Sequence, residues 1–546
     1  MTENLIPRTP SAYDYPLLIK NLFTAPAVNN PHQTIVYRDL QRFSYADFKQ
    51  RVCRLANALT AIGVKAGDTV AVMDWDSHRY LECFYAVPML GAVLHTVNIR
   101  LSAEQILYTI DHAEDDYILV NEEFLPLLEH IKGRIDTVKS YVLLQDEQQQ
   151  VETSLRLAGE YEALLNQAAD SFEFPDFSEN TRATTFYTTG TTGMPKGVYF
   201  SHRQLVLHTL AGMAALGTIP RQGRLHQEDV YMPITPMFHV HAWGLPYIAT
   251  ALGIKQVYPG KYLPEMLLRL IDSEKVTFSH CVPTILHLLM NHPLFKEIDL
   301  SGWKVLIGGA TLPKAMCQAA RARGIDIYSG YGMSETCPVL TLANITAEDL
   351  SNEEELDIRC KTGRPIPLVD LRIVDEQMQD IPADGQSVGE IVVRSPWLTQ
   401  GYLKDQRNSE TLWRGGYLHT GDVANRDQHN YIKITDRIKD VIKIGGEWIS
   451  SLEVEDFLAA HPDIVEAAVI GLPDSKWGEK PVALVVRKES TGITEKDLLT
   501  YIRGFVDKGL MSKQIVLLKI EFVDSIAKTS VGKTDKKLLR EKHQQQ

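Results

Sequence analysis

Residues 187–197 form a glycine- and threonine-rich segment that carries a single lysine, with the sequence YTTGTTGMPKG. The glycines free the backbone to turn and to expose its N–H groups, the threonine hydroxyls add donors, and Lys196 adds positive charge. Together these groups favour a site that holds polyphosphate, although surface turns are also rich in glycine and proline. The candidate phosphate-binding residues are Thr188, Thr189, Gly190, Thr191, Thr192, Gly193 and Lys196.

This segment differs from the Walker A loop of P-loop nucleotide hydrolases. A Walker A loop requires Gly-Lys followed by Ser or Thr, whose hydroxyl binds magnesium. Here Pro195 precedes Lys196 and Gly197 follows it, which removes that hydroxyl. The sequence therefore disfavours a P-loop hydrolase.

Two further segments carry chemically useful side chains. Residues 528–537 read KTSVGKTDKK, and basic runs of this kind are commonly solvated surface segments. Residues 236–243 read PMFHVHAW, but two histidines at this spacing with no third ligand nearby are weak evidence for a metal, so no zinc site is expected. Neither segment identifies a reaction when it is taken alone.

In combination, these segments resemble the acyl-adenylate-forming superfamily, which includes acyl-CoA synthetases, luciferases and the adenylation domains of nonribosomal peptide synthetases. The resemblance covers nearly the whole chain and follows the family's order of motifs. The motifs are residues 188–197, 236–243, 308–310 (GGA), 331–336 (YGMSET), 417–422 (YLHTGD), 436–440 (DRIKD), 445–450 (GGEWIS) and 528–533 (KTSVGK).

The resemblance implies an AMP-forming acyl-CoA ligase with two half-reactions. A carboxylate attacks the α-phosphorus of ATP to give acyl-AMP and pyrophosphate, and the thiol of coenzyme A then displaces AMP. The expected small-molecule partners are therefore a carboxylic acid, ATP, Mg²⁺ and coenzyme A. Because two anions must meet in the first half-reaction, positioned cations should contribute most to catalysis.

By the same resemblance, Lys533 is the catalytic lysine that bridges the substrate carboxylate and the α-phosphate. Glu335 and Thr188 match the residues that help to hold Mg²⁺, a role that suits hard oxygen ligands. Ala527 stands where many members carry proline, which affects the stiffness of the loop more than its chemistry. Lys439 occupies the position of the family's hinge.

The nucleotide is expected to contact a larger set of residues. Asp422 matches the acid that accepts hydrogen bonds from the ribose hydroxyls, and Arg437 matches an arginine that contacts ribose or phosphate. The adenine and acyl pocket would be formed by Gly308, Gly309, Ala310, Ser329, Gly330, Tyr331, Gly332 and Ser334, with Tyr331 able to stack on the base. After rotation of a small domain, the residues that line the pantetheine path or touch the nucleotide would be Lys443, Gly445, Gly446 and Trp448.

The acid-binding residues implied by the resemblance are His239, Val240 and Trp243. They resemble the bacterial medium- and long-chain fatty acyl-CoA synthetases, in which the matching tryptophan gates the acyl tunnel, while Gly309 would leave the pocket floor open. A buried tryptophan is otherwise core material. Short or sulfur-containing acids such as methylthiopropionate, acyl transfer to a carrier protein, and a non-catalytic nucleotide-binding protein remain as alternatives.

Alternating hydrophobic patterns predict the elements that position these residues. Helices are predicted near residues 43–62, 78–92 and 102–113, the last with Ser102 and Gln105 as a capping box. Buried strands are predicted at 68–74, 93–98 and 116–124. This alternation favours α/β architecture, with a large N-terminal domain of layered α/β subdomains.

A change of pattern near the C-terminus predicts a second domain. Residues 452–461 and 495–506 look helical, and 465–471 and 481–488 look like strands, which is enough for a small, mobile α+β domain. We expect an N-terminal domain at 1–436 and a C-terminal domain at 437–546, with a hinge near 436–440. Residues 146–179 read as a helical or loop-like connection.

Composition excludes several other classes of protein. The chain has 546 residues, 44% hydrophobic and 23% charged, so at least two globular domains are expected. A net charge of −13 argues against broad nucleic-acid binding. Six scattered cysteines, the lack of a signal-peptide pattern and the lack of an apolar run of about 18 residues favour a cytoplasmic protein without a membrane span. Relatives of this type are often homodimers.

Overall fold

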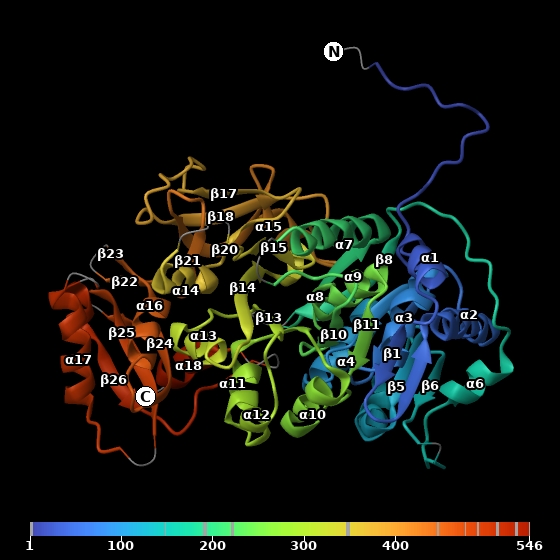
Figure 1. The fold of residues 1–546 in the computed structure, drawn as a ribbon, viewed down its shortest axis with the longest axis horizontal. Coiled ribbons are helices and arrows are strands. Elements are labelled where there is room, and N and C mark those ends of the chain that lie inside the picture. Colours follow the sequence, from blue (N-terminus) through green and yellow to red (C-terminus); the bar gives the residue numbers. More distant parts are fainter. Residues whose placement is uncertain are drawn as a thin grey trace.

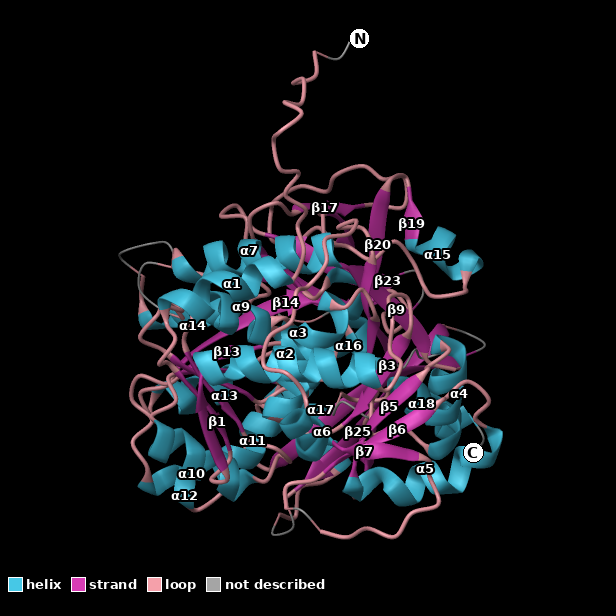
Figure 2. Ribbon diagram, turned by 90° about the vertical axis from the view of Figure 1, so that its right-hand side faces the viewer, coloured by secondary structure: helices cyan, strands magenta, loops and turns pink. Residues whose placement is uncertain are grey.

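The computed structural model describes residues 4–147, 149–188, 194–219, 223–345, 350–444, 447–474, 477–488, 491–508, 511, 513–529 and 533–544. Two large sheets and their helices make up most of the molecule, and a smaller group of strands and helices lies at one end (Figure 1). Figure 2 shows α2 (Tyr45–Ala61) and α3 (His78–Met89) between the strands of these two sheets. The expected α/β class and the large and small domains are confirmed.

The first large sheet has seven strands in the order β7-β6-β5-β3-β4-β8-β9. Its neighbours are parallel except for the antiparallel hairpin of β8 and β9. Its strands are β3 (Thr69–Met73), β4 (Val93–Thr96), β5 (Tyr117–Asn121), β6 (Ser140–Leu144), β7 (Leu157–Glu160), β8 (Arg182–Thr188) and β9 (Lys196–Ser201). The helices of this region are α2 (Tyr45–Ala61), α3 (His78–Met89), α4 (Ala103–Ala113), α5 (Leu125–Ile131) and α6 (Tyr161–Gln167), with short 3₁₀ turns at Glu122–Phe124 and Lys132–Arg134.

The second large sheet has nine strands in the order β16-β15-β14-β13-β12-β10-β11-β1-β2. The six strands from β14 to β1 are parallel, and the outer strands are antiparallel. Its strands are β1 (Thr34–Tyr37), β2 (Gln41–Ser44), β10 (Val230–Pro233), β11 (Lys255–Tyr258), β12 (Phe278–Cys281), β13 (Lys304–Ile307), β14 (Asp326–Gly332), β15 (Val339–Leu342) and β16 (Arg364–Pro365). The helices of this region are α1 (Lys20–Asn29), α7 (His202–Gly217), α8 (Val240–Trp243), α9 (Leu245–Leu252), α10 (Pro264–Glu274), α11 (Pro283–Asn291), α12 (Leu294–Glu297), α13 (Lys314–Arg321) and α14 (Asn352–Cys360), with a 3₁₀ turn at Ser334–Thr336.

An antiparallel sheet of five strands follows, which the hydrophobic pattern did not predict as a separate layer. It contains β17 (Asp370–Val374), β18 (Gly389–Arg394), β19 (Trp413–Arg414), β20 (Tyr417–Arg426) and β21 (Ile432–Arg437), with α15 (Gln406–Leu412) beside it. Strands β20 and β21 pair so that Asp422 lies opposite Arg437.

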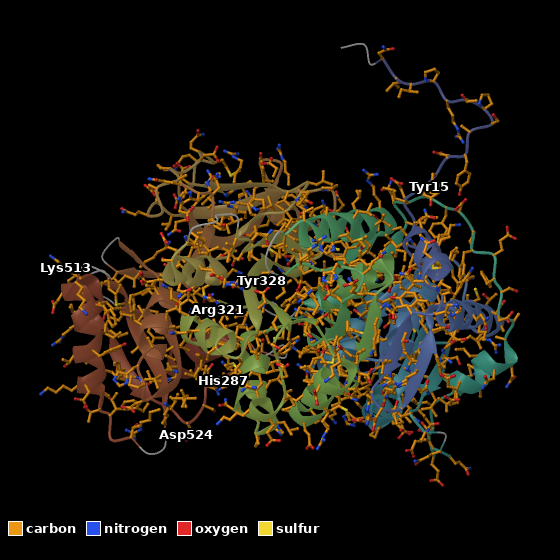
Figure 3. The ribbon with its side chains drawn as sticks, in the orientation of Figure 1. Tyr15, His287, Arg321, Tyr328, Lys513 and Asp524 are labelled. Carbon is orange, nitrogen blue, oxygen red and sulfur yellow. The ribbon has the colours of Figure 1, made fainter. Side chains whose placement is uncertain are left out.

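The small C-terminal group has its own sheet of five strands and its own apolar core. It contains β22 (Ile442–Ile444), β23 (Glu447–Ile449), β24 (Ile464–Asp474), β25 (Gly478–Arg487) and β26 (Lys519–Phe522), with α16 (Ser451–Ala459), α17 (Glu495–Asp507), α18 (Lys536–Gln544) and a 3₁₀ turn at Lys513–Leu517. Figure 3 shows Lys513 at the outer end of this group and Tyr15 on the N-terminal arm, far from it. The boundary expected at 436/437 stays a prediction.

The structure contains the elements that strong local sequence patterns predict. The helices near 43–62, 78–92 and 102–113 are α2, α3 and α4, and Ser102 and Gln105 form the expected capping box. Strands β3 and β5 of the first sheet are buried on both faces, as parallel strands between helices must be. The connection at 146–179, predicted as helical or loop-like, contains the strand β7 as well as the helix α6. The strand was not predicted because it is a short edge strand without clear alternation.

The six cysteines are free thiols, five of them buried. Within the described residues, no helix is both long and apolar enough to cross a bilayer.

Candidate active site

Three of the predicted site segments lie at the carboxyl edge of the nine-stranded sheet. Residues 308–310 follow β13, residues 329–332 end β14, and residues 236–243 follow β10. The chain runs from β10 outward to β11 and then returns to β12 on the other side, so the strand order reverses between β10 and β12. Ligands of open α/β sheets bind outside the carboxyl ends of strands at such a reversal.

Lys533 reaches this edge from the small C-terminal group. Gly309 has φ +76°, and a Cβ atom at this position would lie 3.3 Å from Cε and 3.8 Å from Nζ of Lys533. The same Cβ would lie 3.1 Å from Val282 Cγ1. The floor at Gly309 is thus covered by Lys533 and Val282, whereas the sequence suggested an open floor for an aliphatic chain.

Burial and charged neighbours together set the protonation of Lys533. Burial and the nearby positive charge of Arg437 lower the pKa of its ammonium group to about 8, against the opposing effects of Asp422 and Glu335. The ammonium group therefore lies where an additional anion would stabilise its charged form.

The carboxylate of Asp422, on β20, accepts hydrogen bonds from Tyr331 and from Arg437 on β21. Its Oδ2 accepts a hydrogen bond from the hydroxyl of Tyr331 at 2.7 Å, and its Oδ1 accepts one from Nε of Arg437 at 3.0 Å. Burial, followed by the charge of Asp422, raises the pKa of Tyr331 well above its usual range. Tyr331 is therefore a neutral donor whose ring is held in place by this bond.

Glu335 lies in the 3₁₀ turn after β14 and is buried. Its Oε1 accepts a hydrogen bond from the hydroxyl of Tyr402 at 2.7 Å, and its backbone oxygen accepts one from the N–H of Thr399 at 2.9 Å. Nζ of Lys196 lies 4.6 Å from the centre of the Tyr402 ring, in a cation–π contact. Tyr402 thus joins the predicted metal and phosphate residues. Sequence reasoning missed it, because its only local signal was a Gly-Tyr pair.

The phosphate segment connects the two strands of a hairpin. Thr188 ends β8 and pairs with Lys196 at the start of β9. Thr189, Gly190, Thr191, Thr192 and Gly193 lie outside the described residues. A strand follows this segment, whereas a helix follows a Walker A loop, so the segment does not lead into the helix N-terminus that binds phosphate in P-loop proteins.

Residues 236–243 adopt an unusual backbone. Four successive non-glycine residues are left-handed, with φ of 49° at Val240, 55° at His241, 46° at Ala242 and 59° at Trp243. A left-handed turn costs about 1–2 kcal/mol per non-glycine residue, so the surrounding packing must hold it. The His241 ring is buried between aromatic side chains, with the ring of Phe186 at 5.3 Å and that of Phe84 at 5.7 Å.

The turn places Trp243 against the predicted pocket. A Cβ atom at Gly308 would lie 2.8 Å from Cη2 of Trp243, and the Trp243 ring lies 5.0 Å from that of His280. Burial, with the positive charges of Lys533 and Arg100, lowers the pKa of His239 to about 3, so His239 is neutral. Gly308, Trp243 and His239 are therefore brought together with Lys533.

The predicted hinge residue and the residues predicted to bind coenzyme A lie on other parts of the small group than Lys533. Lys439 is exposed. Lys443 is exposed on β22, and its N–H donates to Glu479 at 2.7 Å. Figure 1 shows β22 and β23 well apart from α18, the helix that follows Lys533. Gly445 and Gly446 lie outside the described residues, as does the side chain of Trp448.

Comparison with known families matches both parts of the chain. The family model described as AMP-binding enzyme matches residues 23–403, and the model described as AMP-binding enzyme C-terminal domain matches residues 453–533. The chain belongs to the AMP-binding enzyme family. This AMP-binding enzyme is an AMP-forming acid–CoA ligase, and it binds ATP.

The names of relatives of this AMP-binding enzyme refer to different acids. It is 40% identical to a long-chain-fatty-acid–CoA ligase of Thermus thermophilus, over 92% of this chain and 91% of the relative. It is 37% identical to a 3-methylmercaptopropionyl-CoA ligase of Ruegeria lacuscaerulensis, over 96% and 97%. It is also 37% identical to a medium-chain-fatty-acid–CoA ligase of Ectopseudomonas oleovorans, over 92% and 91%.

Solved structures share the fold over almost the full length. The anthranilate CoA ligase AuaEII in complex with anthranoyl-AMP aligns with a TM-score of 0.84 at 23% identity, over 97% of this chain and 98% of that chain. ATP-bound MatB from Rhodopseudomonas palustris aligns with a TM-score of 0.81 at 25% identity, over 96% and 98%.

Proposed function

We propose that this acid–CoA ligase activates medium- or long-chain fatty acids. The observation that carries the proposal is the position of Trp243, which covers Gly308 beside the neutral His239 and near Lys533. An acid bound here has its carboxylate at the cation and its chain against apolar and aromatic groups, as a fatty acid requires. Relatives named for long- and medium-chain fatty acids support the same substrate class.

In the first half-reaction, the ammonium of Lys533 bridges the acid's carboxylate and the α-phosphate of ATP. The carboxylate oxygen forms a bond to the α-phosphorus, and the bond from that phosphorus to the pyrophosphate oxygen breaks. Lys533 neutralises the repulsion between the two anions as they meet. Lys196 and residues 188–193 hold the departing pyrophosphate.

Magnesium suits the oxygen groups near the phosphate segment. Glu335 offers a buried carboxylate held by Tyr402, and Thr188 offers a hydroxyl at the end of β8. Two such groups suit Mg²⁺, because this ion is typically held by one or two protein oxygens, keeps several waters and takes its remaining ligands from phosphate. When bound, it would neutralise charge on the phosphates.

The nucleoside is assigned to the strands around Asp422. Its carboxylate accepts bonds from the ribose hydroxyls while Arg437 and Tyr331 keep it in place. The adenine and the acyl group lie along the predicted residues Gly308, Gly309, Ala310, Ser329, Gly330, Tyr331, Gly332 and Ser334. These positions have small side chains or none, apart from Tyr331, and admit a flat base.

In the second half-reaction, the small domain, residues 437–546, rotates about the junction at Lys439. Lys443, Gly445, Gly446 and Trp448 then line the path of coenzyme A. The thiolate sulfur attacks the acyl carbonyl carbon, and the bond to AMP breaks. Two catalytic faces on one mobile domain explain how a single site serves both steps.

A panel of carboxylic acids tests the substrate class. Acids from acetate to palmitate, with methylthiopropionate and benzoate, are assayed for AMP release with and without coenzyme A. We expect the highest kcat/KM for acids of eight or more carbons, roughly tenfold or more above butyrate, because each buried CH₂ contributes about 0.8 kcal/mol. A maximum at methylthiopropionate would favour the second candidate, which the Ruegeria relative supports. Turnover without coenzyme A would favour transfer to another acceptor.

Two variants test the assigned residues. Trp243→Ala should change the ranking of chain lengths while Trp243→Phe keeps it closer to wild type, because only the alanine empties the space beside Gly308. Lys533→Ala should abolish acid-dependent exchange of pyrophosphate into ATP but retain conversion of preformed acyl-AMP into acyl-CoA. Equal losses in both half-reactions would contradict the role of Lys533.

A further inference from the structure

A buried carboxylate, Asp76, lies between the two large sheets. It follows β3 of the seven-stranded sheet, and its backbone oxygen accepts the N–H of Gly260, just after β11 of the nine-stranded sheet. Its Oδ2 accepts a hydrogen bond from the hydroxyl of Tyr262 at 2.5 Å. Its Oδ1 accepts the backbone N–H of Met237 at 2.9 Å.

Met237 belongs to the segment that precedes the left-handed turn. Two more groups from the seven-stranded sheet hold the next residue, because the hydroxyl of Thr96 donates to the backbone oxygen of Phe238 at 3.1 Å and the guanidinium of Arg100 lies 5.8 Å from its ring. The N–H of His239 then donates to the oxygen of Pro236 at 2.9 Å, which closes a tight turn. The segment before His239 and Trp243 is therefore fixed from outside its own sheet.

We propose that Asp76 is a positioning residue for acid binding, whose ionised carboxylate holds residues 236–239 so that His239 and Trp243 face Gly308. This inference rests on the proposed assignment of residues 236–243 to the acid. A carboxylate that accepts an N–H and an O–H makes charge-assisted bonds, which are about twice as strong as neutral ones. Its protonation weakens the hold on Met237 and frees the turn to move.

The surroundings of Asp76 make this hold sensitive to pH. Burial raises the pKa of its carboxyl group to about 7, against the opposing effects of Tyr262, Met237 N–H and Arg100, while Asp74 adds to the rise. The other titratable groups that face it are Tyr80 on α3, Tyr231 on β10 and Tyr258 on β11, all neutral because burial raises their pKa values well above the usual range. The carboxyl group therefore changes charge between pH 6 and 8.

The expected signature is a KM effect on one substrate. As pH falls through about 7, Asp76 takes up a proton, and KM for the acid should rise about tenfold while KM for ATP stays constant. A carboxylic acid substrate has a pKa of about 4–5, too low to cause this change. Lys533 has the opposite pH dependence, since it loses its charge as pH rises and would weaken acid binding at high pH.

Asp76→Asn provides the first test, with Asp229→Asn as the matched control. Asp229 is also a buried aspartate, but it precedes β10, whereas the acid segment follows that strand. At pH 8, Asp76→Asn should raise KM for the acid about tenfold, and it should remove the rise in KM that the wild-type enzyme shows as pH falls from 8 to 6. Asp229→Asn should retain the wild-type profile. Equal profiles for the two variants would overturn the proposal.

Tyr262→Phe provides a second test that does not depend on losing the carboxylate. It removes a hydrogen bond that lowers the pKa of Asp76, so the inflection in KM should move to higher pH. An unmoved inflection would overturn the proposal. If Trp243→Ala changes chain-length selectivity but Asp76→Asn has no effect on KM, only the positioning role fails. If neither variant affects the acid, the assignment of residues 236–243 to acid binding fails with it.

Discussion

The side chain of Lys533 lies against Gly309, and its Cε is 3.3 Å from the position that a Cβ atom at residue 309 would occupy. These two residues come from different domains and are far apart in the sequence. Their contact brings Lys533 of the small domain to the carboxyl edge of the nine-stranded sheet. In the mechanism proposed above, this is the arrangement of the first half-reaction.

Gly309→Ala should therefore slow acyl-AMP formation more than acyl-CoA formation from preformed acyl-AMP. The added methyl group meets Lys533 and Val282, and we expect a loss of roughly tenfold or more in the first step only, since a small misplacement of a catalytic group costs this much. Pyrophosphate exchange and thioester formation are measured separately. Gly302→Ala is the control, because Gly302 also has positive φ, +84°, but no atom lies within 4 Å of its added Cβ. Similar losses in the two variants would mean that backbone strain, and not Lys533, is responsible.

The adenylation rate should fall as pH rises through about 8. Burial and Arg437 lower the pKa of Lys533 to that value, so its ammonium group is charged below pH 8 and neutral above it. Because kcat/KM reports the free enzyme, kcat/KM for adenylation should fall about tenfold per pH unit on the alkaline side. The kcat should fall later, since bound anions favour the charged form. An alkaline limb that begins only near pH 10 would contradict the lowered pKa.

Lys536→Met should destabilise the docked arrangement of the small domain. Nζ of Lys536 donates to Ser451 at 2.6 Å and pairs with Glu455 at 2.8 Å, and Ser451 in turn binds Asp436 at the junction. Loss of this buried cation should cost about 3 kcal/mol and slow adenylation.

Thermal unfolding and pyrophosphate exchange measure these two effects of Lys536→Met. The deficit should shrink as pH falls, because the pKa values of Asp436 and Glu455 are already raised by burial and their protonation removes the unpaired charge. Lys537→Met, next in the chain, is the control, because the Lys537 side chain is 39% exposed and pairs only at the surface with Glu541. Equal destabilisation by the two variants would exclude the role given to Lys536.

Ala242→Gly should destabilise the protein less than Ala249→Gly. Both alanines are fully buried, so each variant loses one methyl group and gains backbone entropy in the unfolded chain. Only Ala242 is left-handed, and glycine relieves about 1–2 kcal/mol of strain there. Urea unfolding should therefore separate the variants by about that amount. Equal losses would show that the turn carries no such strain.

The sequence was informative where local patterns and motifs were strong. The helix at Ala103–Ala113 was predicted because its apolar spacing and its capping box agree. The motifs also indicated which of their residues would meet, and Asp422, Arg437 and Glu335 do lie within electrostatic reach of Lys533. Their assigned roles remain predictions.

The remaining features depend on tertiary contacts. The left-handed turn at Val240–Trp243 opposes the intrinsic preference of every residue in it, so packing around His241 must impose it. The bond between Tyr402 and Glu335 joins positions 67 residues apart, and no local signal marks it. The hairpin around the phosphate segment was not predicted, because no local sequence pattern in β9 distinguishes a strand from the start of a helix.

Asp422 on β20 and Tyr331 on β14 both lie before the junction at 436–440, and a hydrogen bond joins them. In the proposed mechanism, rotation about the junction carries Lys533 away but leaves these two residues where they are. The mixed anhydride then stays held through its ribose while the groups around its carbonyl are exchanged. The activated acid therefore does not have to diffuse through bulk solvent, where it would be hydrolysed, between two separate sites.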